Sequence, residues 1–558
     1  MKKITLLLLG ATCALSAGAQ IRLGDGQLSG SFETNSIYYV DDAKMTDVAG
    51  YAVPEDRFGS NNYLKLDYNY GRFSAGIQME AYMPMLLGFN EIPDAFHGFK
   101  LASKYVQWQD ENFGILVGDI YDQFGNGLIF RSYEDRALGF NNSLEGVRGT
   151  YNFGNYVQFK GLYGRPRLYM DYEDSWIRGA DLSVSLADIF GLREAMFTLE
   201  GSYVNRFQKI DEEKSLHQGV SDQVRPNLNM YSGRLNLDWK GITARFEYVT
   251  KGEDDLFSVG AKGNVAKGNV YLAELGYSHK GFSVLGSFRR LEHMATLLSI
   301  YGEGTGNLIN YIPALTRQYT YLLTNLNPYQ VNPDGELGGQ VDVYYSLRNK
   351  SARYKYWNLH ANFSTYYTLK ENTQNNKANL LWRDINVDVE RQWNRSLKTS
   401  LLLSRQEWSP THGSGDFDGI TFASNIIVGD VTYKFNPRYS LRAELQYLYS
   451  DYVRPEYRVL ADDAGTDWLA FLLEFNIAPK WSFFFSDMMN FNRAYQEDGE
   501  TQVEKTVHYP SGGFSFTKSR TRIQLSFGRN RKGFVCSGGV CREQPAFTGV
   551  SLLLTSSF

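Results

Sequence analysis

One short stretch of the sequence brings together the residue types of a hydrolytic triad. His412, Ser414 and Asp416 alternate with glycines, and a serine nucleophile, a histidine base and a carboxylate are the groups that serine hydrolases combine. Such a triad requires fixed hydrogen-bond geometry, whereas the glycines of this stretch predict a flexible loop. We therefore predict no catalytic residues and expect that the chain is not an enzyme.

Cysteine chemistry is confined to Cys536 and Cys541 once an N-terminal export signal, which holds Cys13, is removed. A redox pair is normally spaced by two residues beside a helix, whereas a longer stretch containing Gly538-Gly539 separates these two. A zinc site would lack further ligands. In an oxidising compartment we predict a structural disulfide, and we predict neither a metal nor a cofactor.

Mixed charges gather in the segment from Asp119 to Asn142, which contains Arg131, Glu134, Asp135 and Arg136. If this segment folds into a barrel, these four residues are the candidate lumen constriction, because such charges select solutes by charge and size. Alternatively, the segment is a solvated loop whose charges pair among themselves. Both interpretations stay open at this point.

The first residues have the features of a cleavable secretory signal. Lys2 and Lys3 provide the positive start, residues 4–15 the apolar run, and Ala17 and Ala19 the small-residue cleavage site. The apolar run is shorter than the roughly 20 residues that a membrane-spanning helix needs. We predict that residues 1–19 are removed and that the mature chain starts at Gln20.

The composition predicts a β-rich chain that is aromatic and polar at once. It includes 39 Tyr, 35 Phe, 9 Trp and 53 Gly but only 14 Pro, and no long apolar run follows the signal. Outer-membrane barrels have such a composition because apolar lipid-facing residues alternate with polar lumen-facing ones along each strand. Removing the two signal lysines takes the formal net charge from −4 to −6, so nothing favours binding to nucleic acid.

Alternation of apolar and polar residues recurs along the mature chain, as expected for strands with one face in lipid and the other in water. One clear example is the segment from Ser440 to Tyr449. Its odd-numbered positions hold Leu441, Ala443, Leu445, Tyr447 and Tyr449, and its even-numbered positions from 440 to 446 hold Ser440, Arg442, Glu444 and Gln446.

The connections between these segments are of two kinds. Tight turns are predicted at residues 70–71, 110–112, 154–155, 240–241, 279–281, 394–396, 436–438, 478–480 and 518–519, with less regular turns at 187–193 and 348–356. Long polar stretches such as residues 41–61, 206–228 and 451–466 lie between them. Short turns on one rim and long loops on the other are typical of outer-membrane barrels. This succession of alternating segments, short turns and long loops predicts one transmembrane antiparallel barrel over residues 20–558, with about 24 strands (roughly 22–26).

The longest connection runs from Leu291 to Leu337 and is too apolar for a loose loop. Long connections without regular structure are uncommon unless they have a function, and a barrel of this size encloses a lumen that is either open or plugged. We predict that residues 291–337 form an inward plug or a partner-binding cap. The first strand is expected near Gln27, which leaves little room for a separate N-terminal plug.

The end of the chain has the features of a membrane-insertion strand. Val550, Leu552, Leu554 and Phe558 fall on one face of the predicted last strand, which ends in an aromatic residue. Such a strand resembles the signal by which the outer-membrane assembly machinery recognises its clients. The alternative is an ordinary edge strand of a soluble protein, which the signal peptide and the two kinds of connection disfavour.

Three stretches together resemble an uncharacterised outer-membrane β-barrel family of the Bacteroidota. They are Gly118-Asp119 with the run from Gln123 to Glu134, the run from Asn310 to Thr316, and the run from Cys536 to Arg542. The resemblance covers nearly the whole mature chain. It implies location in the bacterial outer membrane, among outer-membrane lipid and lipopolysaccharide, and it implies no activity and no functional residues.

Two functions remain open from the sequence. The first is a passive or gated channel for small solutes, narrowed by the charged segment and by residues 291–337. The second is a sealed barrel that serves as an anchor or subunit for a surface lipoprotein or for a secretion or assembly complex, because the Tyr-rich connection would also suit a protein interface.

Overall fold

The structure is a computed structural model of the chain. It describes residues 21–558 except residues 47, 49, 90–97, 169–170, 257–263, 303–307, 350, 353, 374, 411–418, 452, 454–456, 458–465, 492–493, 498–499, 504–505 and 538–539.

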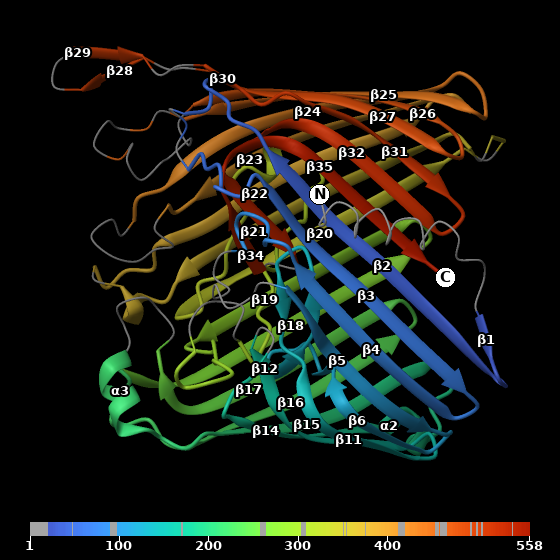
Figure 1. The fold of residues 1–558 in the computed structure, drawn as a ribbon, viewed down its shortest axis with the longest axis vertical. Helices are drawn as coiled ribbons and strands as arrows, with labels where there is room; N and C mark the ends of the chain where they lie inside the picture. Colours follow the sequence, from blue (N-terminus) through green and yellow to red (C-terminus); the bar gives the residue numbers. More distant parts are fainter. Residues whose placement is uncertain are drawn as a thin grey trace.

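Twenty-four antiparallel strands form one closed barrel (Figure 1). The ring closes where β35 pairs with β2, from Ser31 opposite Ser557 to Tyr39 opposite Gly549. A closed ring leaves no free sheet edge, which is the condition for crossing lipid as a sheet. The predicted fold class and strand number are therefore confirmed. The barrel strands are β2 (Gly26–Tyr39), β3 (Phe58–Tyr70), β4 (Phe73–Tyr82), β5 (Gly98–Gln109), β6 (Phe113–Ile120), β11 (Leu144–Phe153), β12 (Val157–Leu168), β14 (Trp176–Ser185), β15 (Ala195–Phe207), β16 (Asn227–Trp239), β17 (Ile242–Asp255), β18 (Val265–His279), β19 (Phe282–Glu292), β20 (Gly335–Arg348), β21 (Tyr356–Thr368), β22 (Leu380–Gln392), β23 (Leu397–Trp408), β24 (Phe422–Lys434), β25 (Tyr439–Ser450), β26 (Asp467–Ile477), β27 (Trp481–Phe491), β31 (Ser511–Lys518), β32 (Thr521–Asn530) and β35 (Phe547–Ser557).

The remaining elements are short; β1 precedes the first barrel strand, and the others lie in the connections between strands. Within the described residues, no helix is long and apolar enough to cross a lipid bilayer. These elements are β1 (Ile21–Leu23), β7 (Asp122–Phe124), β8 (Phe130–Ser132), β9 (Glu134–Asp135), β10 (Phe140–Asn141), β13 (Asp171–Tyr172), β28 (Ala494–Glu497), β29 (Glu500–Val503), β30 (Val507–His508), β33 (Gly533–Ser537), β34 (Val540–Gln544), the helices α2 (Leu186–Phe190) and α3 (Glu212–Gln218), and the 3-10 helices η2 (Leu323–Asn325) and η3 (Lys370–Asn372).

The predicted tight turns all join neighbouring barrel strands at one end of the barrel, which we call the short-turn end; the opposite end is the long-loop end. Local backbone chemistry explains two of them. Lys240 and Gly241 have φ of 48° and 84°, and Lys280 and Gly281 have φ of 39° and 88°. Positive φ at both central residues gives the two-residue hairpin turn whose twist matches that of the flanking strands.

Side chains on each strand alternate between lipid and lumen, as β16 illustrates. Tyr231 and Trp239 point outward and are 53% and 45% exposed, whereas Met230, Ser232 and Arg234 point inward and are buried. The outer face is therefore apolar and aromatic, and the inner face carries most of the polar groups. This distribution is the one expected for a barrel in lipid.

The last strand, β35, has the alternation that the sequence predicts. Val550 and Leu552 share a face with Phe527 and Leu525, their register partners on β32, whose side chains are exposed. Leu554 lies on the same face. Phe558 follows the strand and exchanges two backbone hydrogen bonds of 2.9 Å with Gly30. The role of this strand in insertion stays a prediction, and the predicted signal peptide lies outside the described residues.

Candidate functional site

Two long connections enter the lumen from the long-loop end, and we call their described residues the plug. The first is residues 121–143, between β6 and β11, and the second is residues 293–334, between β19 and β20. Leu291 and Leu337, the ends of the predicted segment, themselves belong to β19 and β20. The plug therefore consists of loops that the barrel itself provides.

The plug reaches well-separated parts of the barrel wall. On one side, Asn126 donates from Nδ2 to Glu247 on β17 over 2.8 Å. Farther round the ring, the backbone N–H of Leu323 donates to Gln446 on β25 over 2.9 Å. Between β17 and β25 in the ring, the plug also accepts from Gln406 on β23, through the Thr324 carbonyl at 3.1 Å. The plug therefore extends across the lumen and is not confined to one strand pair.

Backbone groups join the two plug segments into one body. The N–H of Arg131 donates to the Ile309 carbonyl, and the N–H of Tyr311 donates to the Gly127 carbonyl, each over 2.9 Å. The Asn310 amide adds a bond to the Leu128 carbonyl over 3.1 Å. Because these bonds satisfy backbone groups that are out of contact with water, separating the segments would leave polar atoms unpaired.

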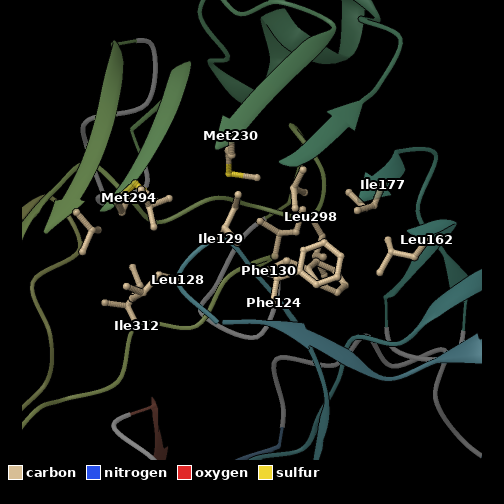
Figure 2. Close-up of a cluster of buried hydrophobic side chains, with 14 of the residues drawn as sticks. Phe124, Leu128, Ile129, Phe130, Leu162, Ile177, Met230, Met294, Leu298 and Ile312 are labelled. Atoms are coloured by element: carbon tan, nitrogen blue, oxygen red, sulfur yellow. The ribbon is translucent and has the colours of Figure 1, made fainter. Parts of the chain in front are cut away.

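An apolar core holds the plug against one side of the wall (Figure 2). Phe124 and Phe130 of the first segment lie beside Leu298 of the second, next to Leu162 and Ile177 of the wall. The two phenylalanine rings lie 5.2 Å apart. Residues of this kind are excluded from water, and burial of each large apolar side chain contributes roughly 1.5–3 kcal/mol. This half of the plug is packed like a protein interior.

A buried ion pair joins the two strands between which the second plug segment runs, and it binds that segment. Arg289 on β19 and Glu336 on β20 are both fully buried and meet at 2.6 Å. Arg289 also donates to the Pro313 carbonyl at 2.5 Å, and Glu336 accepts from the N–H of Asn332 at 3.0 Å and from the Tyr329 hydroxyl. Buried charges persist only when paired and hydrogen-bonded. The pair therefore couples the wall directly to the plug.

A second buried cation lies under the tip of the first segment. Arg234 on β16 is 3% exposed and contacts Asp181 and Glu200 at 2.6 Å each, with Glu247 at 4.0 Å. Gly125 at the plug tip has φ of 53°, and a Cβ at that position would lie 2.5 Å from the Arg234 side chain. Glycine is thus required both by the conformation and by the close approach.

Of the predicted constriction residues, Glu134 and Arg136 lie together on the plug. Arg136 contacts Glu134 and Glu33 of β2 at 3.0 Å each, and its guanidinium lies over the Tyr63 ring. Burial opposes the charged form, yet the two carboxylates outweigh it and raise the pKa of Arg136 above its ordinary value. The side chain ties the first plug segment to the wall.

The other two constriction residues have different neighbours. The Arg131 guanidinium lies over the rings of both Tyr133 and Tyr311, at 4.1 and 3.9 Å from their centroids. Tyr311 belongs to the second plug segment, so this contact adds to the joint between the segments. Asp135 accepts from the N–H groups of Ala137 and Leu138 and stabilises a turn. The role of these four residues as a lumen constriction stays a prediction.

The predicted disulfide between Cys536 and Cys541 is present, and it closes the hairpin formed by β33 and β34. The hairpin contacts the first plug segment, because the Arg542 guanidinium donates to the Ala137 carbonyl at 3.3 Å. Arg531, which precedes the hairpin, donates to the Leu326 carbonyl of the second segment at 3.2 Å. The hairpin and the residue before it therefore give the plug further support.

Replacing both cysteines with serine should loosen this hairpin without unfolding the barrel. Removing the cross-link of so short a loop costs about 2 kcal/mol in the loop-entropy model, and the barrel seam is held by separate strand pairs. Limited proteolysis should cut residues 531–545 of the variant faster than those of the oxidised wild type. Equal cleavage rates would show that the plug contacts alone order the hairpin.

Exposure to solvent changes with depth along the inner wall. On β22, Asp384 and Asn386 lie under the plug and are buried, whereas Asp388 and Glu390, nearer the short-turn end, are 19% and 27% exposed. Arg317 of the plug contacts Asp388 at 2.5 Å, at the boundary between the two zones. The lumen is therefore filled toward the long-loop end, and polar, water-accessible groups line it toward the short-turn end.

Sequence reasoning missed the buried ion pairs of the wall that lie against the plug. Arg289, Glu336 and Arg234 occupy inward positions of alternating segments, the first two near the long-loop end and Arg234 near the middle of its strand, and a charge at an inward position is the signal that could have identified them. Their partners come from other strands, so spacing along the chain does not identify them.

The histidine, serine and aspartate at positions 412, 414 and 416 lie outside the described residues. Among the residues that the structure does describe, no group of three or more His, Cys, Asp or Glu side chains could hold a metal ion.

A closed antiparallel ring, an apolar outer face and a polar inner face define a transmembrane β-barrel of the outer-membrane class. The chain belongs to the family of unknown function DUF6029, whose model matches residues 1–558. No curated protein sequence matches the chain.

Three solved structures are similar to the chain at low sequence identity. The siderophore receptor PirA from Pseudomonas aeruginosa is 9% identical, with a TM-score of 0.43, and the match covers 96% of this chain and 81% of that chain. The copper transporter OprC is 9% identical, with a TM-score of 0.42 and coverage of 97% and 81%. The receptor PirA from Acinetobacter baumannii is 8% identical, with a TM-score of 0.40 and coverage of 95% and 80%.

Proposed function

We propose that the chain is a gated channel for small solutes in the bacterial outer membrane of a member of the Bacteroidota, and that its own plug closes it in this conformation. The observation that carries the proposal is the change in exposure along the inner wall. A barrel that served only as an anchor would have no need for a polar, water-accessible zone below a filled one. A channel closed at one end has both zones.

The contacts of the plug fit a gate. The plug is a connection within the chain, so it can move without leaving the barrel, and polar contacts at defined points hold it to the wall. Arg317 joins the plug to Asp388, and His360 lies between Asp388 and Asp342 at 2.9 and 2.7 Å. A solute or partner that competes for these charges would release this edge of the plug.

The second plug segment can be removed without disturbing the strands that carry it. Glu292 and Gly335 are register partners on β19 and β20, so an Asn-Gly turn can replace residues 293–334 and close a regular hairpin. We expect wild-type protein in planar bilayers to be nearly silent, with brief openings. The shortened variant should carry a steady ion current of much larger amplitude.

Heat-modifiable migration in a denaturing gel serves as the folding control for both proteins. A folded, shortened variant that stays silent would contradict the channel and favour the sealed barrel. A wild-type barrel that conducts steadily would contradict closure by the plug.

The extensive apolar packing of the plug favours the second candidate, a sealed barrel that anchors a complex. On that proposal, a surface lipoprotein or a secretion or assembly complex would bind the long-loop end. A pull-down from native membranes tests it, because a stoichiometric lipoprotein should co-purify with wild type and be lost when the long-loop end is altered. The outer-membrane assembly machinery, lipid and lipopolysaccharide are proposed partners under either function.

A further inference from the structure

The turns at the short-turn end carry an uneven distribution of charge. Six consecutive turns, from the one between β18 and β19 to the one between β31 and β32, each hold a cation in an exposed position, and none of them contains Asp or Glu. The cations are Lys280, Lys355, Arg395, Arg438, Lys480 and Arg520. We call these six turns the cationic arc. The other turns at the short-turn end, outside the cationic arc, include Asp110, Glu111, Asp188 and Glu194.

The cations of the arc lack carboxylate partners. Within the described part of the chain, none of the six side chains forms an ion pair. Two cations at the same end of the barrel but outside the arc are paired, Arg72 with Asp110 at 3.6 Å and Lys240 with Glu194 at 3.0 Å. The arc thus presents uncompensated positive charge to whatever lies beside it.

Outward-facing aromatic rings accompany these charges. Arg391, just before the turn that holds Arg395, has its guanidinium 4.1 Å from the Trp357 ring centroid and 3.4 Å from that of Trp393. Two neighbouring turns form a groove of about 650 Å³ that Arg438, Lys480, Trp481, Pro437 and Pro479 line. Tryptophan at such a rim lies at the level of lipid headgroups.

We propose that the cationic arc binds anionic phospholipid headgroups of the periplasmic leaflet, and that the groove between Arg438 and Lys480 is its principal site. The phosphate would lie between these two cations, and the upper part of an acyl chain would lie along Trp481 and Phe483, whose ring centroids are 6.0 Å apart. The proposal rests on the placement of the barrel in the outer membrane and not on the channel.

Charge and position together select a lipid as the occupant. The arc is at the rim of the lipid-facing surface, where Trp481 and Phe483 are 39% and 41% exposed. A soluble anion would use the cations alone, whereas a phospholipid uses both the cations and the aromatic surface beside them. Short turns of outer-membrane barrels face the periplasm, so the leaflet concerned is the phospholipid leaflet.

Trp481 provides a reporter inside the groove. The full-length barrel is reconstituted in phosphatidylcholine vesicles, and brominated phosphatidylglycerol or brominated phosphatidylcholine is added as a quencher. The difference between wild type and Trp481→Phe isolates quenching at this site. Each cation beside an anionic lipid changes association by about fivefold. We expect phosphatidylglycerol to be preferred at least about fivefold, and Arg438→Gln/Lys480→Gln to remove the preference.

The matched control is Arg72→Gln/Arg193→Gln, which removes two cations from the same end of the barrel outside the arc. This control should keep the wild-type preference for phosphatidylglycerol. Added salt should weaken that preference in both the wild type and the control variant. Equal quenching by the two lipids in wild type would overturn the proposal, as would an unchanged preference in the Arg438→Gln/Lys480→Gln variant. Binding of polyglutamate without any lipid preference would assign the arc to a soluble anionic partner and would also overturn it.

Discussion

Replacing Glu336 with glutamine should release the second plug segment from the wall. The change leaves the Arg289 guanidinium fully buried with no carboxylate, because Glu336 is its 2.6 Å partner and both side chains are inaccessible to water. Breaking one side of a buried ion pair typically costs about 3–5 kcal/mol. Hydrogen exchange of the backbone amides in residues 311–334 should accelerate by a factor of at least about 100, since each 1.4 kcal/mol corresponds to about tenfold.

The double variant Arg289→Met/Glu336→Leu is the matched control for this result. It removes both charges together, so no buried group is left unpaired, and most of the lost protection should return. If Glu336→Gln exchanges no faster than wild type, the ion pair does not hold the plug. If the double variant is as labile as the single one, the hydrogen bonds to Asn332 and Tyr329 are what matter.

Arg234→Met should give the second large effect, because it leaves three carboxylates facing one another. Asp181, Glu200 and Glu247 surround Arg234, two of them at 2.6 Å. We expect a loss of about 3–5 kcal/mol in the free energy of unfolding at neutral pH, measured by urea titration in lipid vesicles. The loss should shrink in acid, where protonation of the carboxylates removes their mutual repulsion.

Arg245→Met on the adjacent strand provides the comparison, since Arg245 is inward but exposed. This substitution should change the free energy of unfolding by less than about 1 kcal/mol. An equal loss in the two variants would mean that any inward arginine has the same effect and that the buried cluster has no special role.

The fold could be predicted because its rules are local. Alternation with a period of two assigns the faces of a strand, and turn residues such as Lys240-Gly241 fix where each strand reverses. Each strand then pairs with its neighbour in sequence, so the strand number follows from the turns. Closure of the ring adds only one non-local pairing, that of β35 with β2.

The site could be predicted only in part, because its contacts are non-local. Apolar residues in the connection from Leu291 to Leu337 indicated an inward plug or a cap, and nothing in the sequence chose between them. The choice depends on the inner wall, where Leu162, Ile177 and Met230 come from three different strands. The sequence likewise grouped Arg131 with Arg136 because they are close in the chain, although Arg131 contacts Tyr311 of the second plug segment and Arg136 contacts Glu33 of β2.

The pairing of β2 with β35 has a consequence for biogenesis. The seam needs the first and the last barrel strands at once, so a ribosome must finish the polypeptide before the ring can close. Until then both edges are open and prone to pair with other chains. Export must therefore keep the chain unclosed and shielded until its final residues arrive.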